Sequence, residues 1–158
     1  MASTGSERRL KDKKIGEIIN PRLIQAPPTT TVERAVEIMR ENKSAYIVVS
    51  DKKRVVGMFT ESDLAQKILG KNVDWSRPIR DFMSDDPVVL RPEDTVGRAV
   101  DFMAECDFYH IPLVNEKQEL VNVLSVRTLV RFLAEFYPGE VYNIPPNPHQ
   151  IASQREGG

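Results

Sequence analysis

The sequence predicts a mixed α/β (α+β) fold made of two copies of one small β-α-β-β-α unit. Three observations predict it: an internal repeat, the same order of elements in each copy, and short apolar runs that alternate with amphipathic helices. The repeat is clearest where Thr31–Glu41 aligns with Thr95–Glu105 at a shift of 64 residues, with seven of eleven positions identical. Chance does not produce such agreement, so the chain is an internal duplication.

The first copy opens with an amphipathic helix, because its apolar residues recur at i, i+3, i+4 and i+7: Val32, Ala35, Val36 and Met39. Thr30 and Glu33, three residues apart, predict a capping box at its start. The β-branched runs 45–49 and 54–59 predict two strands joined by a charged turn. A second helix carries Leu64, Ala65, Ile68 and Leu69 on one face and ends at Gly70.

The second copy repeats this order. It predicts a helix over 95–105, strands over 109–114 and 119–124, and a helix over 126–136. A short strand is expected before the first helix of each copy, at 23–25 and at 88–90. Each copy of about 60 residues is marginal as an independent domain. We therefore expect the two copies to pack sheet against sheet and to fold as one unit.

The chain is expected to divide into five parts. These are a polar N-terminal tail (1–12), the first repeat (13–70), a linker (71–78), the second repeat (79–137) and a tail rich in proline and glycine (138–158). The composition of the last part, with four prolines and three glycines, is typical of a segment without a fold of its own.

The composition limits the function. With 41% hydrophobic and 28% charged residues, the chain is typical of a globular cytoplasmic protein, and no segment resembles a secretion signal or a membrane span. The net charge of −1 does not favour binding to nucleic acid or to a membrane surface. A single cysteine, Cys106, and two histidines, His110 and His149, do not predict a metal site. No nucleophile–base pair or phosphate-binding glycine loop indicates an enzyme.

The repeated elements resemble the CBS-domain family, named after cystathionine β-synthase. The resemblance rests on the duplicated Thr-Val-x-x-Ala-Val-x-x-Met helix and on three segments, 57–64 (Gly-Met-Phe-Thr-Glu-Ser-Asp-Leu), 79–88 and 110–114. It covers about residues 14–136. The resemblance implies two repeats related by a pseudo-twofold axis with two clefts between them, often in a homodimer. It also implies a regulatory ligand in the clefts: AMP, ADP, ATP or S-adenosylmethionine.

The first cleft is expected to hold the stronger site. At the end of a strand, Gly57 lets a ligand approach, the carboxylate of Asp63 matches the two hydroxyls of a ribose, and Thr60 can donate to ribose or phosphate. The resemblance implies that the base lies against the first strand of the other copy. The predicted ligand-binding residues are Gly57, Met58, Thr60, Asp63, Pro87, Val88, Val89 and His110.

A structural alternative remains open, because Thr-x-x-Asp before an apolar helix is also a capping box that binds nothing. The second cleft is expected to be weaker, since Asn122 stands where the first copy has Gly57, and Thr128 stands where it has Asp63. Its candidate residues are Leu23, Ile24, Ser125, Arg127 and Thr128.

The sequence therefore predicts a regulatory module, without catalysis, metal or required cofactor, that senses an adenosyl ligand and signals to an effector protein. The alternative is a structural dimerisation protein, or scaffold, whose clefts have lost their ligand. The intact Gly57, Thr60 and Asp63 favour the first interpretation, and the altered second cleft favours the other.

Overall fold

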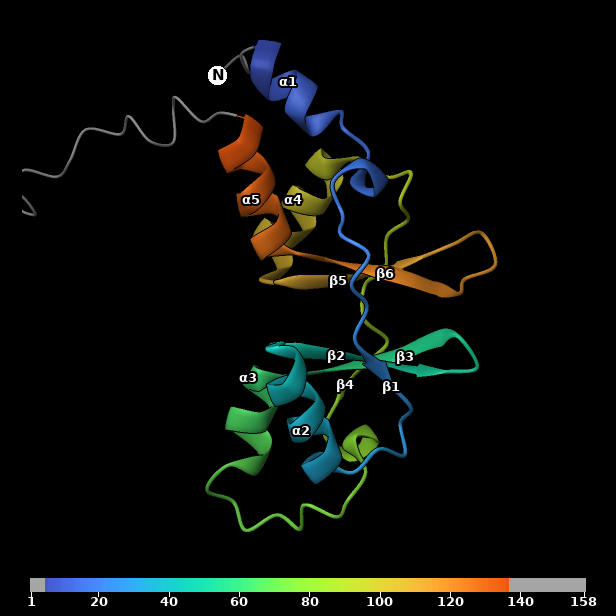
Figure 1. The fold of residues 1–158 in the computed structure, drawn as a ribbon, viewed down its shortest axis with the longest axis vertical. Coiled ribbons are helices and arrows are strands. Elements are labelled where there is room, and N and C mark those ends of the chain that lie inside the picture. The colour runs from blue at the N-terminus through green and yellow to red at the C-terminus, as the bar shows by residue number, and fades with distance from the viewer. Residues whose placement is uncertain (1–4, 137–158) are drawn as a thin grey trace, which may run out of the picture.

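The computed structural model describes residues 5–136, and Figure 1 shows two similar halves stacked on each other. In the lower half, one side of a sheet is covered by helices. Its elements are β1 (Gln25–Ala26), α2 (Val32–Asn42), β2 (Tyr46–Asp51), β3 (Arg54–Thr60), α3 (Glu61–Asp63) and the π-helical turn η2 (Leu64–Ile68). The upper half contains α4 (Val96–Cys106), β5 (His110–Val114), β6 (Leu120–Ser125) and α5 (Val126–Phe136). Both helices and strands thus follow the predicted duplicated order.

The first sheet has the strand order β1-β2-β3-β4, with β1 parallel to β2 and the other pairs antiparallel. Strand β4 (Ser84–Asp85) comes from the chain that leads into the second half. The second sheet is the antiparallel pair β5-β6. The strand predicted at 88–90 is reduced there to one parallel bridge between Leu90 and Leu113, with Leu90 N donating to Pro112 O at 3.1 Å.

The first helix of each half begins at a threonine cap. Thr31 Oγ1 accepts a hydrogen bond from Arg34 N at 3.2 Å, so the capping box predicted at Thr30 and Glu33 is wrong by one residue. Thr95 caps α4 in the same way, through Arg98 N at 3.2 Å. Helix α2 buries Val32, Ala35 and Met39, as its period predicts.

The segment before each half packs into the core of the other half. The 3-10 turn η1 (Ile15–Glu17) precedes the first half, yet Ile15 is fully buried in the second core with Leu90, Val96, Ala99, Ile111, Leu113, Leu124 and Leu129. Backbone hydrogen bonds from Ile15 N to Asp94 O (2.9 Å) and from Val96 N to Lys13 O (2.8 Å) hold it there. Figure 1 shows this blue segment descending from α1 beside the upper half to β1 in the lower half.

The segment before the second half packs in the same way into the core of the first half. We call the segment before each half its lead-in segment, and the reciprocal packing of the two segments the exchange. Turn η3 (Ile79–Asp81) places Ile79 in the first core, and Ile79 N donates to Thr30 O at 2.8 Å. The two exchanges form equivalent backbone bridges, Lys14 with Thr95 and Thr31 with Pro78. Each residue of one bridge is 64 positions from its counterpart in the other, the shift of the repeat. The halves are therefore related by a pseudo-twofold axis, as expected.

The two sheets also pack on each other. A small apolar cluster between them joins Val48 and Met58 of the first sheet to Val123 of the second, with Leu23, Tyr46, Val55 and Leu120 around it. At the hairpin ends, Leu120 N donates to Lys53 O at 2.7 Å. The predicted sheet-to-sheet packing is confirmed.

A further helix, α1 (Gly5–Lys11), lies within the stretch described from the sequence as a polar tail. It contacts α4, where a side chain at Gly97 would meet Lys11 Cβ at 3.0 Å. The C-terminal tail predicted at 138–158 lies outside the described residues. Across residues 5–136, the helices are too short or too polar to span a membrane.

The exchange of lead-in segments predicts that Ile15 stabilises the distant second core. Ile15→Ala should lower the free energy of unfolding by about 2–5 kcal/mol, because it leaves a cavity in a packed core. Urea unfolding measures this loss. Val121→Ala, at a residue 41% exposed in the same half, is the matched control and should change stability by less than about 0.5 kcal/mol. Equal effects of the two substitutions would show that Ile15 is not packed in that core.

Candidate functional site

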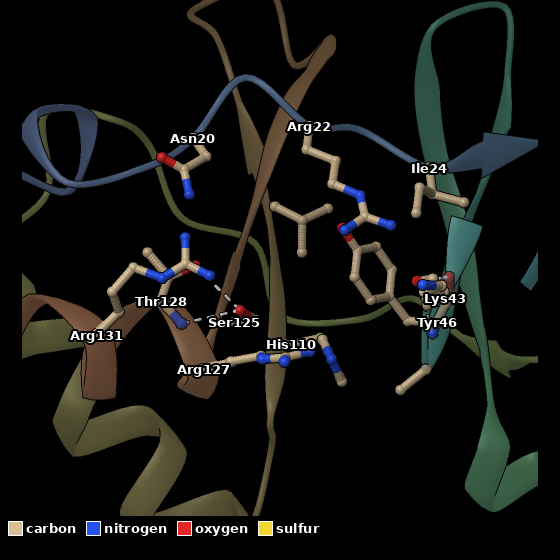
Figure 2. Close-up of a pocket in the computed structure, with 13 residues that line it drawn as sticks. Asn20, Arg22, Ile24, Lys43, Tyr46, His110, Ser125, Arg127, Thr128 and Arg131 are labelled. Atoms are coloured by element: carbon tan, nitrogen blue, oxygen red, sulfur yellow. Dashed lines mark hydrogen bonds between the residues drawn. The ribbon is translucent and has the colours of Figure 1, made fainter.

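A cavity of about 190 Å³ lies between the two halves, at the second of the two predicted clefts. Its wall is built by the connector from η1 to β1, the turn after α2, the first residue of β5, and the junction of β6 with α5. Figure 2 shows their side chains around one space. The lining residues are Asn20, Arg22, Ile24, Lys43, Ser44, Ala45, Tyr46, His110, Val123, Ser125, Arg127, Thr128 and Arg131.

The cavity is strongly basic. Arg22, Lys43, Arg127 and Arg131 line it together with His110, and the lining contains no carboxylate. Within the described part of the chain, none of these four cations forms a salt bridge. These cations are exposed and stand near one another without a negative counter-charge in the lining. An anion that bound there would supply it.

The start of α5 forms part of this wall. Ser125 Oγ accepts from Thr128 N at 3.2 Å and lies 3.1 Å from Thr128 Oγ1. The hydroxyls thus cap the helix at the cavity, where the positive end of the helix dipole favours an anion. Arg127 and Arg131, one turn apart on the same helix, extend toward the same space (Figure 2).

His110 and Tyr46 occupy equivalent positions in the two repeats and meet at the cavity wall. Their ring centroids are 4.6 Å apart, with an angle of 40° between the ring planes. Burial lowers the pKa of His110, so the imidazole is neutral at pH 7. Burial raises the pKa of Tyr46, an effect that the nearby Arg22 partly offsets. The pair presents a neutral polar surface between the cations.

At the first cleft, the carboxylate of Asp63, which the sequence predicts to bind a ribose, already has partners within the protein. Asp63 is buried, and its Oδ2 accepts from Thr60 N (3.0 Å) and Thr60 Oγ1 (3.1 Å). Its Oδ1 lies 2.7 Å from Lys67 Nζ, which also donates to Phe82 O at 2.7 Å. Thr60 and Asp63 therefore form the complete capping box that the sequence left as the alternative.

One pair of equivalent residues that distinguishes the two clefts is Gly57 and Asn122. Gly57 pairs directly with the lead-in strand β4, and a Cβ atom there would lie 2.8 Å from Ser84 O. The missing side chain thus admits another strand to β3. Asn122 is buried and instead reaches Asn20, the counterpart of Ser84, through its Nδ2 at 2.9 Å from Asn20 O. Its side chain separates the connector from β6, and the cavity lies beside this connector.

Besides Gly57, Thr60 and Asp63, the predicted site residues separate into three groups. The structure brings Ile24, Ser125, Arg127 and Thr128 together around the cavity, and it adds His110, which the sequence grouped with the first cleft. Met58 and Leu23 belong to the apolar cluster between the sheets. Residues 87–89 follow β4 and are half-buried.

Sequence reasoning missed Asn20, Arg22, Lys43, Tyr46 and Arg131 as cavity residues. Arg131 could have been found, because it follows Arg127 by four residues on a predicted helix. Arg22 and Lys43 lie in a connector and at a helix end, where no periodicity indicates the direction of a side chain.

The comparisons with known proteins agree with this architecture. A protein-family model described as "CBS domain" matches residues 15–70 and again residues 79–135. An uncharacterized 17.7 kDa protein of Acidianus ambivalens is 26% identical over 125 residues, covering 78% of this chain and 75% of that protein. The inosine-5'-monophosphate dehydrogenase of Halobacterium salinarum is 30% identical over 122 residues, which are 75% of this chain but 24% of that enzyme.

The fold is shared with solved structures, of which we give two. The CBS domain protein PAE2072 from Pyrobaculum aerophilum, complexed with AMP, superposes with a TM-score of 0.71 at 23% identity, covering 80% of this chain and 100% of that chain. The CBS domain pair of protein MJ0100, in complex with 5-methylthioadenosine and S-adenosyl-L-methionine, gives 0.70 at 18% identity, with coverages of 77% and 99%.

Burial of His110 predicts a pH dependence of stability. Since its pKa in the folded chain lies below the ordinary value of 6.5, the unfolded chain takes up a proton first as the pH falls. The contribution of His110 is complete above about pH 6.5 and is lost below it. Urea unfolding at about pH 7.5 and pH 5.5 should show this loss, and His110→Gln should reduce it. His149→Gln is the control; a loss that follows His149 instead would contradict the assignment.

Proposed function

Because the chain belongs to the CBS-domain family, we propose that it is a regulatory module that binds an adenosyl ligand between its repeats and signals the occupancy to a partner protein. The ligand classes are AMP, ADP, ATP and S-adenosylmethionine. AMP occurs in one solved CBS structure that shares its fold, and S-adenosyl-L-methionine occurs in another. In this proposal the chain regulates another protein and catalyses no reaction itself.

The observation that carries the proposal is the basic cavity between the repeats. Four cationic side chains that form no salt bridge within residues 5–136, together with a helix N-terminus, surround a lining without a carboxylate, an arrangement that favours a phosphate group. The planar guanidinium groups of Arg22, Arg127 and Arg131 are suited to phosphate oxygens, which they can bind through two parallel hydrogen bonds. Tyr46 and His110 offer ring surfaces in the same wall against which a base can stack.

In this proposal, the second cleft holds the stronger site. The first cleft, with Gly57, Met58, Thr60, Asp63, Pro87, Val88 and Val89, remains a proposed second site of lower affinity. A ribose that uses both carboxylate oxygens of Asp63 competes there with Thr60 for Oδ2, whose two hydrogen bonds are already made, and shares Oδ1 with Lys67. The second cleft requires no such competition for a charged group.

Helix α5 offers a route for the signal. Arg127 and Arg131 line the cavity, whereas Val126, Val130 and Leu133 form an exposed apolar stripe on the same helix. Such a stripe favours contact with another protein surface. We propose that a second copy of the chain or the effector packs against this stripe, so that a ligand that moves α5 also changes that contact.

Paired substitutions test which cleft holds the ligand. Arg127→Gln should weaken the binding of AMP about 10- to 100-fold, because it removes a charge-assisted contact. Asp63→Asn should leave this affinity unchanged and lower the free energy of unfolding by about 1–3 kcal/mol, because it leaves Lys67 without its buried partner. Arg98→Gln, a cation on α4 that pairs with Asp94, is the control.

Isothermal titration calorimetry measures both affinity and stoichiometry, and one strong site per chain is expected. A tenfold loss on Asp63→Asn with no loss on Arg127→Gln would place the ligand in the first cleft. If AMP, ADP, ATP and S-adenosylmethionine all fail to bind, the sensor proposal is wrong and the structural dimerisation protein becomes the better account.

Assembly is tested separately. The exposed stripe on α5 predicts a homodimer at micromolar concentration, and Val130→Glu, which places a charge on a residue 60% exposed, should dissociate it without unfolding the chain. Light scattering measures the mass. A mass of 17.9 kDa for the unsubstituted chain, with and without nucleotide, would contradict the homodimer.

A further inference from the structure

A second cavity, of about 500 Å³, adjoins the basic cavity on the side of the first repeat's helices. Its wall is formed by the C-terminal half of α2, the turn that follows, and the start of the helical segment after β3. The lining residues are Val36, Met39, Arg40, Lys43, Ser44, Ala45, Glu61, Leu64 and Arg127.

The two cavities share part of their wall. Lys43, Ser44, Ala45 and Arg127 line both, so the two cationic groups stand where one space meets the other. Figure 2 shows Arg127 and Lys43 approaching the basic cavity from opposite repeats. A ligand held by Arg127 in the first space therefore lies at the edge of the second.

The second cavity is also positive overall. Arg40 adds a third cation beyond Lys43 and Arg127, and Glu61 is the single carboxylate in the lining. Within residues 5–136, no salt bridge joins Glu61 or any other acid to Arg40. Arg34, on the same helix, differs: its Nη1 lies 2.9 Å from Glu37 Oε2 and 3.4 Å from Glu41 Oε1.

Apart from Ser44, the rest of the wall is apolar. Met39 is buried, and Val36 and Leu64 are half-buried, all packed in the first core. An apolar floor lowers the local dielectric constant and strengthens the attraction between the cations and an anionic group. An apolar ligand alone would leave three cations without a counter-charge.

We propose that this second cavity receives the terminal phosphates of an adenine nucleotide, so that the chain binds ATP more tightly than ADP, and ADP more tightly than AMP. The inference rests on the proposed function, since it extends the ligand of the basic cavity past Lys43 and Arg127 toward Arg40. Each further phosphate adds negative charge where unpaired cations stand. The methionyl arm of S-adenosylmethionine carries a sulfonium, an ammonium and a carboxylate group, and the same cations disfavour its net charge of about +1 relative to the negative phosphates of a nucleotide.

The experiment compares ATP, ADP and AMP by calorimetry with the full chain, at one ionic strength and without divalent cations. We expect the Kd of ATP to lie about tenfold or more below that of AMP, the change conferred by a charge-assisted hydrogen bond. Arg40→Gln should remove most of this advantage and leave the Kd of AMP unchanged. Glu61→Gln should increase it, because it removes the one repelling carboxylate.

Arg34→Gln is the matched control on α2, since it removes an equal charge outside both cavities and should leave all three affinities unchanged. Equal affinity for ATP and AMP, or an equal loss of both on Arg40→Gln, would overturn the inference while AMP binding still upholds the proposed function. If AMP does not bind at all, the proposed function itself fails. Circular dichroism of each variant establishes that the fold is retained.

Discussion

The structure depends on the exchange of the two lead-in segments. Each repeat is too short to complete its own core, and Ile15 and Ile79 fill the core of the opposite repeat. Backbone hydrogen bonds at Lys13–Ile15 and at Arg77–Ile79 then hold each lead-in segment against the opposite repeat. As a result, two connectors must cross between the sheets, and one of them, which contains Asn20 and Arg22, forms a wall of the basic cavity.

The symmetry of the duplication is broken where a ligand site can form. Gly57 lets its connector pair as strand β4, whereas Asn122 holds the equivalent connector through a side-chain hydrogen bond. The charges differ as well: Asp63 is satisfied inside its own repeat, while Arg127 and Arg131 at the corresponding helix start have no described acidic partner. The carboxylate of one repeat is thus paired inside that repeat, whereas the other repeat offers cations without a described counter-charge.

Much of the fold could be predicted from the sequence, because the duplication aligns and the apolar periods define helices and strands. The exchange of the lead-in segments could not be predicted from the sequence. Ile15 and Ile79 occupy equivalent positions in the repeat, and either core would accept either residue. The site was harder to predict. The absence of a side chain at Gly57 indicates space, but whether a ligand or a strand fills it depends on tertiary packing. Arg22 and Lys43 line one cavity with Arg127 only because a connector and a helix end of the first repeat lie next to the start of α5 in the second repeat.

The central claim is that the adenosyl ligand lies in the basic cavity of the second cleft. A crystal structure of the chain with a bound adenine nucleotide tests it most directly. The account predicts electron density between the connector at Arg22 and the start of α5, with phosphate oxygens within hydrogen-bonding distance of Arg127 and the base near Tyr46 and His110. Density in the first cleft, with the ribose on Asp63, would contradict it.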